Sequence, residues 1–472
     1  MISSSETAFA DGLAALVDLL GADRVATGAD HRSQHGADES FLPTVAPDFV
    51  VWPRSVEEAA AIVRVAIAHR LPLIPFGAGT SLEGQIAALH GGVSVDMREL
   101  NQIWPPSIED LDVRVQAGVT RRQLEARLLP EGVFFSVDPG GDATIGGMVA
   151  TGASGTTAVR YGTMRHNVLA LTLVNGRGEV VHTGSRARKS SAGYDLTRLL
   201  IGSEGTLGLI CEATLRIQPT PEAIAAAICT FPTVADAVEC SVALGHNSIQ
   251  VARVELLDEW MVEGVNRHSQ MSMTVAPTLL LEFNGRSDED VAAQARDAAA
   301  IAAEYRGGSF EWAVDESQRR ALWRARHSAL DANKSLRPGS VPFTNDICVP
   351  VSALAAAVTD ARADLDAHGL IATIVGHLGD GNFHVAVMIE PGNERELADA
   401  EAFSSRCVER ALAVDGTCTG EHGIGYGKSR FLVAEHGREA IAMMQAIKHA
   451  LDPHGIFNPG KGALAADVEL SS

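Results

Sequence analysis

The residues best suited to chemistry are two histidines, a glutamate and a further histidine in the C-terminal part of the chain. His377 closes one apolar run and His384 opens the next, and residues 379–382, Gly-Asp-Gly-Asn, are typical of a hairpin turn. Glu421 and His422 follow later, in a stretch too rich in glycine to be core. Two imidazoles and one carboxylate form a three-ligand set that leaves a metal coordination position open for a substrate. A chance pairing is the alternative, because the chain has 16 histidines.

A glycine-rich loop at residues 75–84 is the second chemical element, and it follows a run typical of a buried strand at residues 71–74. Glycines let backbone N–H groups converge on an anion, and the hydroxyls of Thr80 and Ser81 stand beside them. This pattern suits the pyrophosphate of a nucleotide cofactor, and a plain turn is the alternative. Two more glycine-rich regions, residues 138–155 and 199–210, predict a long cofactor lying across one domain.

Charge and cysteine usage restrict the partners. The net charge is −21, with 59 acidic against 38 basic residues, which argues against nucleic acid or an anionic membrane surface as a partner. The six cysteines show no C-x-x-C spacing, which fits a reducing compartment. Arg24, the first basic residue, follows an acidic run, so we expect neither a secretory signal nor an Arg-rich transit peptide. No apolar run reaches membrane-spanning length, and we expect a cytoplasmic protein.

The elements that must position these residues are expected to form two or three domains, because a chain of 472 residues is longer than one hydrophobic core usually supports. A β-α-β unit at residues 49–76 feeds the first glycine loop, with Ser55 and Glu58 in capping-box spacing. After a proline-rich break at residues 219–221, the order at residues 224–313 becomes β-α-β-β-α-β, which is ferredoxin-like. Other predicted segments are a helix at 5–20, a polar linker at 30–40, strands at 93–95, 113–115, 133–137, 211–217 and 343–349, and helices at 121–129, 316–333, 351–367 and 394–414.

Taken together, these motifs resemble a known family. The loop at 75–84, the Gly-Ser-Glu-Gly-Thr run at 202–206, the histidine hairpin, the Gly-Glu-His-Gly run at 420–423 and residues 452–461 resemble the FAD-linked 2-hydroxyacid dehydrogenases of the vanillyl-alcohol-oxidase superfamily. The resemblance covers nearly the whole chain. Residues 322–327, 344–350 and 416–422 are most similar to its D-lactate dehydrogenase (cytochrome) branch.

The resemblance implies an α+β fold, with a PCMH-type FAD-binding domain and a ferredoxin-like α+β substrate (cap) domain. The implied boundaries are an N-terminal helix and linker at 1–42, the FAD-binding domain at 43–220, the substrate and metal domain at 221–450, and a C-terminal segment at 451–472 that returns to the flavin.

The resemblance also implies roles for individual residues. The implied FAD contacts are Phe76, Gly77, Ala78, Gly79, Thr80, Ser81, Thr144, Gly147, Thr151, Glu204, Gly205, Ile210 and Asn458. The implied ligands of a divalent metal, zinc or manganese, are His377, His384 and Glu421, with His422 as the catalytic base and Arg326 as the arginine that binds the substrate carboxylate. The first glycine loop contains no histidine or cysteine, so we expect non-covalent FAD.

The expected reaction is oxidation of a small D-2-hydroxy acid, first of all D-lactate to pyruvate, with glycolate and D-2-hydroxyglutarate as alternatives. Hydroxyglutarate dehydrogenases of the family carry a lysine where this chain has Thr344, so a second carboxylate would lack its partner. The resemblance leaves open whether a quinone, a cytochrome, a flavoprotein or oxygen accepts the electrons, and whether the protein is a homodimer.

Other classes of protein fit the sequence less well. A Rossmann enzyme needs G-x-G-x-x-G, but Leu82 stands at the third glycine position. A P-loop ending at Gly427-Lys428-Ser429 would need a glycine where the chain has His422. A non-catalytic metal-binding protein is a further alternative, which the visible absorbance of a flavin would exclude.

Overall fold

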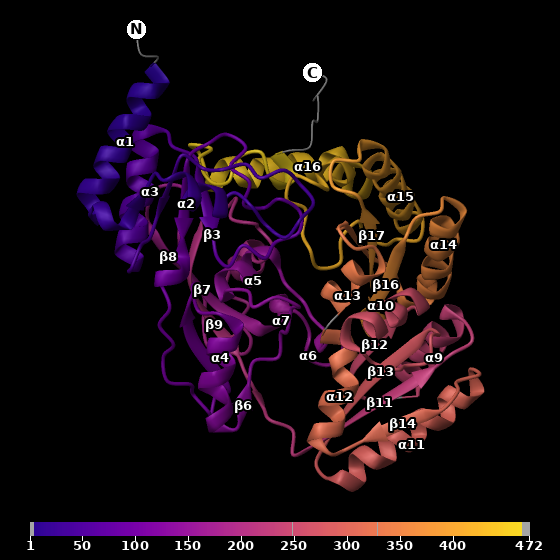
Figure 1. Ribbon diagram of the computed structural model, residues 1–472. Coiled ribbons are helices and arrows are strands. Elements are labelled where there is room, and N and C mark those ends of the chain that lie inside the picture. The colour runs from indigo at the N-terminus through magenta and orange to yellow at the C-terminus, as the bar shows by residue number, and fades with distance from the viewer. Residues whose placement is uncertain (1–3, 248, 328, 465–472) are drawn as a thin grey trace. The chain divides into compact units, whose positions relative to one another are not determined.

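The computed structural model describes residues 4–247, 249–327 and 329–464, and the chain forms two compact units (Figure 1). The first unit comprises Met1–Ser154, Thr163–Thr220 and Glu421–Ser472, and the second comprises Gly155–Gly162 and Pro221–Gly420. Of the predicted C-terminal segment, residues 465–472 lie outside the described part of the chain.

The first unit contains a four-stranded sheet in the order β1-β2-β4-β3. Strands β2 and β3 run parallel to β4, and β1 is antiparallel to β2. Helix α3 (Val56–His69) connects β2 to β3, and Ser55 caps it by accepting the N–H of Glu58 at 3.1 Å. The predicted β-α-β unit is therefore confirmed. The strands are β1 (Val25–Ala26), β2 (Phe49–Val51), β3 (Leu73–Phe76) and β4 (Val93–Asp96).

A second, antiparallel sheet of the first unit has the order β5-β9-β7-β8. Its inward residues, among them Val115 and Leu215, are fully buried in an apolar core with Ile145. The strands are β5 (Asp112–Gln116), β7 (Val168–Val174), β8 (Val180–Gly184) and β9 (Leu209–Arg216), and a separate ribbon pairs β6 (Val133–Phe134) with β10 (Gln218–Pro219).

Several helices of the first unit were not predicted. Helix α5 lies in the second glycine-rich region, where Ile145, Met148 and Val149 recur at helical spacing and are buried. Helix α16 includes Gly437, whose φ of 78° interrupts the helical backbone. The helices are α1 (Ser4–Leu20), α2 (Ala29–Gln34), α3, α4 (Arg121–Leu128), α5 (Ile145–Thr151), α7 (Met164–Asn167), α8 (Leu196–Leu200), α16 (Leu432–Leu451), η1 (Ala22–Arg24), η2 (Met97–Glu99), η3 (Leu129–Glu131), η6 (Ser429–Phe431) and η7 (Gly462–Leu464).

The second unit is built on a seven-stranded antiparallel sheet in the order β14-β11-β13-β12-β16-β17-β15. Its first four strands have the order of a ferredoxin-like fold, in which the fourth strand lies beside the first and the third beside the second, so the predicted strand arrangement is confirmed. Helix α10 (Glu259–Ser269), which was not predicted, lies between the second and third of these strands in the sequence. The strands are β11 (Ala223–Thr230), β12 (Val251–Leu257), β13 (Thr278–Gly285), β14 (Phe310–Ala313), β15 (Val341–Cys348), β16 (Ala372–His377) and β17 (Asn382–Ile389).

The rest of this sheet repeats the same plan. Strand β15, helix α14, strands β16 and β17 and helix α15 follow in the order β-α-β-β-α, and β16 pairs with β12 to join the two halves. In place of a fourth strand the repeat has one bridge, Cys348 to Thr417. The helices of the unit are α6 (Ala158–Tyr161), α9 (Val234–His246), α10 (Glu259–Ser269), α11 (Asp288–Glu304), α12 (Glu316–His327), α13 (Ala329–Leu336), α14 (Leu354–Ala367), α15 (Glu394–Leu412), η4 (Val351–Ala353) and η5 (Leu378–Asp380).

The compact units and the predicted domains share one boundary. The second unit begins at Pro221, where the substrate domain is predicted to begin. It ends at Gly420, however, so α16 belongs to the first unit, and the short segment Gly155–Gly162 joins the second because α6 packs against β12. Among the described helices, none is long and apolar enough to cross a bilayer.

Candidate active site

The first glycine loop follows β3, as predicted, and its backbone requires glycine at two positions. Gly79 and Gly84 both have φ of +75°, a conformation that other residues rarely adopt. At Gly77 the restriction is one of space, because a Cβ would lie 2.2 Å from the Thr144 Oγ1. The first two glycine-rich regions therefore meet here.

Three predicted FAD contacts lie at or on the short helix α5. Thr144 caps this helix by accepting the N–H of Gly147 at 3.3 Å, and the Thr151 hydroxyl donates to the Gly147 carbonyl at 3.1 Å. The helix thus presents these residues together, beside the loop that contains Gly77.

Part of the predicted polar linker supports the loop instead of spacing two elements. Asp38 accepts the hydroxyl of Ser81 at 3.0 Å and the N–H of Gly84 at 3.0 Å. Nearby, the ring of His35 lies 4.3 Å from that of Phe76, so a predicted cofactor residue rests on the segment after α2.

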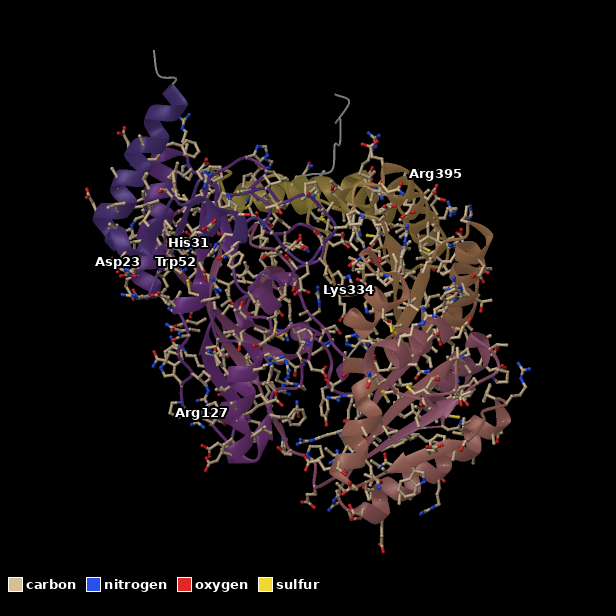
Figure 2. The ribbon with its side chains drawn as sticks, viewed as in Figure 1. Asp23, His31, Trp52, Arg127, Lys334 and Arg395 are labelled. Atoms are coloured by element: carbon tan, nitrogen blue, oxygen red, sulfur yellow. The ribbon has the colours of Figure 1, made fainter. Side chains whose placement is uncertain are left out.

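A buried carboxylate anchors that supporting segment. Asp96 accepts hydrogen bonds from His35 Nε2 at 2.9 Å and from Trp52 Nε1 at 2.8 Å. Figure 2 shows Trp52 beside His31, and their rings are 5.6 Å apart. Helix α2 occupies part of the predicted linker, and its His31, like His35 directly after the helix, packs against Trp52.

Glu204, a predicted FAD contact, uses its carboxylate within the protein. The carboxylate accepts the N–H of Ile424 at 2.7 Å, the N–H of Gly425 at 2.9 Å and the amide of Gln85 at 3.2 Å. Burial raises the pKa of Glu204, and these donors oppose the increase. Gln85 also donates to the carbonyl of His422 at 2.8 Å. Together, the two side chains hold the backbone that follows Glu421.

Asn458 brings the C-terminal segment to the same place. Its amide donates to the carbonyls of Gln85 at 3.0 Å and Glu204 at 2.8 Å. Lys461 is buried beside it and donates to the Asn458 side chain at 3.3 Å. Burial lowers the pKa of Lys461 to about 8.

The last two predicted FAD contacts, Gly205 and Ile210, pack against or lie within the sheets of the first unit. Gly205 has φ of +69°, and a Cβ there would meet the ring of Pro75 at 2.7 Å. Ile210 lies on β9 and is buried in the core.

In the second unit, the predicted histidine hairpin is confirmed. His377 ends β16, whereas β17 begins at Asn382, two residues before His384. The two imidazole rings are 5.2 Å apart and nearly perpendicular. His377 Nδ1 lies 2.6 Å from an oxygen of Glu255. A carboxylate only accepts, so this contact places a hydrogen on Nδ1 and, in the neutral ring, the lone pair on Nε2, as in metal-binding histidines.

The Glu255 carboxylate also contacts Arg326. The Arg326 Nε donates to the second oxygen of Glu255 at 2.6 Å, and the Glu255 side chain is completely buried. Burial would raise the pKa of Glu255, but the adjacent His377 and Arg326 hold that pKa below its usual value. The carboxylate is therefore ionised at neutral pH.

A second buried carboxylate, Asp346, serves the other histidine. His384 Nδ1 lies 3.3 Å from one oxygen of Asp346. The other oxygen accepts the hydroxyl of Thr419 and the N–H of Gly420, each at 2.7 Å. Because Gly420 directly precedes Glu421, Asp346 fixes the chain one peptide bond before the predicted third ligand.

The structure thus gathers the predicted residues into two sets, one in each unit. The first unit holds the glycine loop, α5, Asn458, Glu421 and His422, and the second holds His377, His384 and Arg326. Sequence reasoning missed the supporting side chains, which are Asp38, Gln85, Glu255 and Asp346. The one signal in the sequence is an acid within an apolar strand, as in Val-Glu-Leu-Leu at residues 254–257.

Comparisons with known families agree with this geometry. A profile described as "FAD binding domain" matches residues 47–184, and one described as "FAD linked oxidases, C-terminal domain" matches residues 220–462. The chain belongs to the FAD-linked oxidase family. The expected family is confirmed, and this FAD-linked oxidase is an oxidoreductase that uses FAD.

Two relatives extend the similarity along the chain. A Danio rerio protein named "Probable D-lactate dehydrogenase, mitochondrial" is 46% identical over 444 residues, which are 93% of this chain and 89% of that protein. An Arabidopsis thaliana protein named "D-lactate dehydrogenase [cytochrome], mitochondrial" is 45% identical over 441 residues, which are 93% of this chain and 78% of that protein. The expected resemblance to the D-lactate dehydrogenase branch is confirmed.

A solved structure establishes the fold of this FAD-linked oxidase. The crystal structure of p-cresol methylhydroxylase with substrate bound matches with a TM-score of 0.80 at 17% sequence identity, over 97% of each chain. At this identity the match concerns the fold alone, and it confirms the expected PCMH-type α+β architecture.

Proposed function

We propose that the protein oxidises D-lactate to pyruvate with non-covalently bound FAD and one divalent metal ion, zinc or manganese. The observation that supports this most directly is the arrangement around Glu255, where a predicted metal ligand and a predicted substrate arginine meet one carboxylate. The names of the relatives support D-lactate as the substrate.

The residues present fit a divalent metal. His377 and His384 have adjacent rings, and His377 Nδ1 is bonded to a carboxylate, the usual arrangement in a histidine that ligates through Nε2. Glu421 directly follows Gly420, which is held by Asp346, and we assign it as the third ligand. Two imidazoles and a carboxylate suit zinc or manganese and leave a position for substrate oxygen.

The chain's own residues bind the acid and accept a proton. When bound, a divalent metal would lower the pKa of the substrate hydroxyl, and FAD would take the hydride from Cα. Arg326, held through Nε, binds the substrate carboxylate with its terminal amino groups. His422, whose carbonyl is held by Gln85, accepts the hydroxyl proton as the general base.

The cofactor residues are assigned to the first unit. We assign the pyrophosphate to the loop of Phe76, Gly77, Ala78, Gly79, Thr80 and Ser81. The close packing of Gly77 on Thr144 supports a backbone shaped for near approach. The further assigned FAD contacts are Thr144, Gly147, Thr151, Glu204, Gly205, Ile210 and Asn458.

Substrate size and setting complete the proposal. Thr344 on β15 favours a monocarboxylate over D-2-hydroxyglutarate, and glycolate is the nearer alternative. The six free cysteines support the expected cytoplasmic location, with peripheral membrane association as an alternative.

The electron acceptor that we propose is a quinone, a cytochrome or a flavoprotein, and the assembly to be tested is a homodimer. We also keep residues 43–220 as the FAD-binding domain, 221–450 as the substrate and metal domain and 451–472 as the flavin-contacting segment.

Anaerobic bleaching of the flavin band tests this proposal. D-lactate, L-lactate, glycolate and D-2-hydroxyglutarate are added separately, before and after treatment with EDTA. We expect fast bleaching by D-lactate alone, its loss after chelation and its return with zinc or manganese. Bleaching by another acid would change the substrate, and no bleaching by any of them would overturn the proposed reaction.

A further inference from the structure

The Glu255 carboxylate is shared between two side chains in the middle of the seven-stranded sheet. Glu255 lies directly opposite His377 where β12 pairs with β16, the pairing that joins the two halves of the sheet. One carboxylate oxygen contacts His377 Nδ1 and the other accepts the N–H of Arg326 Nε, each at 2.6 Å. The side chain has no exposed surface.

Each contact fixes a property that the partner needs. The hydrogen on His377 Nδ1 faces the carboxylate, so in the neutral ring the lone pair lies on Nε2. The guanidinium of Arg326 is held at Nε, so its two terminal amino groups can bind a second carboxylate. Removing either partner would leave a buried negative charge poorly compensated.

We propose that Glu255 is a positioning residue that holds the metal ligand His377 and the substrate-binding Arg326 in one arrangement. This inference rests on the proposed function, since it assigns a metal to His377 and a carboxylate to Arg326. One side chain thereby orients both groups that bind a 2-hydroxy acid. His377 holds the metal that binds the substrate hydroxyl oxygen, and Arg326 binds the substrate carboxylate.

The variant Glu255→Gln separates these two contacts with little change in volume. A glutamine amide offers one acceptor oxygen and one NH₂ donor, so its NH₂ must face either His377 Nδ1 or Arg326 Nε. Facing His377, it forces the ring proton to Nε2 and removes the lone pair from that atom. Facing Arg326, it meets a donor and releases the guanidinium. The substitution must therefore weaken metal binding or substrate binding.

A matched control is Glu282→Gln. Glu282 is also a buried carboxylate of this sheet, on β13, and it forms an ion pair with Arg253 at 3.5 Å. A general effect of losing a buried acid from the sheet would appear in both variants. An effect through His377 or Arg326 would appear at Glu255 alone.

The experiment uses the full-length, FAD-loaded protein and Mn²⁺ as the probe. Free Mn²⁺ is followed by its EPR signal without substrate, and KM and kcat for D-lactate are measured separately at saturating Mn²⁺. For Glu255→Gln we expect Mn²⁺ binding about 10- to 100-fold weaker, or KM raised by a similar factor, with Glu282→Gln within about twofold of wild type. Glu255→Asp keeps both acceptor oxygens, so it should recover part of the loss.

The outcomes are separable. If Glu255→Gln matches wild type in both measurements, or if Glu282→Gln loses as much, the inference is overturned. If wild type binds Mn²⁺ weakly and non-stoichiometrically, the proposed metal site itself fails. The thermal midpoint and flavin absorbance are recorded for every variant, and if Glu255→Gln does not fold, Glu255→Asp takes its place with an intermediate loss expected.

Discussion

The carboxylate of Glu204 accepts the backbone N–H of Gly425 at 2.9 Å, across 221 positions of sequence. A side chain of the third glycine-rich region thus holds the loop that contains Glu421 and His422. This carboxylate therefore has a structural role in positioning that loop.

Replacing Glu204 with alanine should loosen that loop. The change leaves the N–H groups of Ile424 and Gly425 without their acceptor, at roughly 1–3 kcal/mol each. We expect amide hydrogen exchange in residues 421–426 to rise at least about tenfold and kcat to fall. Glu212→Ala, which removes a buried acid paired with Arg114 in the same unit, is the control. Normal exchange together with lost flavin would show that Glu204 acts on the cofactor instead.

Replacing His422 with alanine should remove the base and spare the binding sites. The hydrogen bond from Gln85 goes to the backbone carbonyl, so the loop stays in place. We expect a yellow, metal-loaded protein whose kcat is about a hundred- to ten-thousand-fold lower. Flavin absorbance, metal analysis and turnover test this expectation, and wild-type turnover would remove His422 from the mechanism.

Replacing Gly77 with alanine should weaken FAD binding, because the new Cβ would lie 2.2 Å from Thr144 Oγ1. A clash of this kind costs about 1–3 kcal/mol, and about tenfold weaker FAD binding is expected. Adding Thr144→Ala removes the clashing atom and should restore part of the affinity. Thr144→Ala alone is the control, and no recovery in the double variant would argue against this contact.

Acid precipitation should release the flavin from wild type, because we expect no covalent link.

Asp364 should make the stability of the second unit depend on acid pH. Burial opposes its ionisation, but Arg406 and Arg410 hold the pKa of this carboxyl at about 2, below the ordinary 3.8. The unfolded chain therefore binds the proton first as pH falls, so the stabilisation is complete above about pH 4 and is lost toward pH 2. We expect Asp364→Asn to lower the free energy of unfolding by about 1–2 kcal/mol at pH 7. Thermal midpoints should converge with wild type as pH falls, and a constant difference would contradict the pKa.

Local patterns explain what could be predicted from the sequence. The β-α-β unit, the cap at Ser55 and the turn between His377 and Asn382 each depend on residues close together in the chain. The partners of the site depend on pairing between distant segments. Glu255 meets His377 across 122 positions, and no local pattern encodes that register. Helix α16 was missed because Gly437 breaks its backbone. The roles assigned to the FAD and metal residues stay predictions.

The hydrogen bonds of Asn458 to Gln85 and Glu204 also limit when the first unit can complete its fold during synthesis. Asn458 and Gln85 are 373 positions apart, and Phe457 forms a bridge with Leu73 beside the first glycine loop. A ribosome therefore produces that loop long before the segment that closes around it. During synthesis, the first unit cannot form these contacts until residues 457 and 458 have been added to the chain. A nascent chain stalled before residue 457 would therefore lack these contacts, and its first unit would be incomplete.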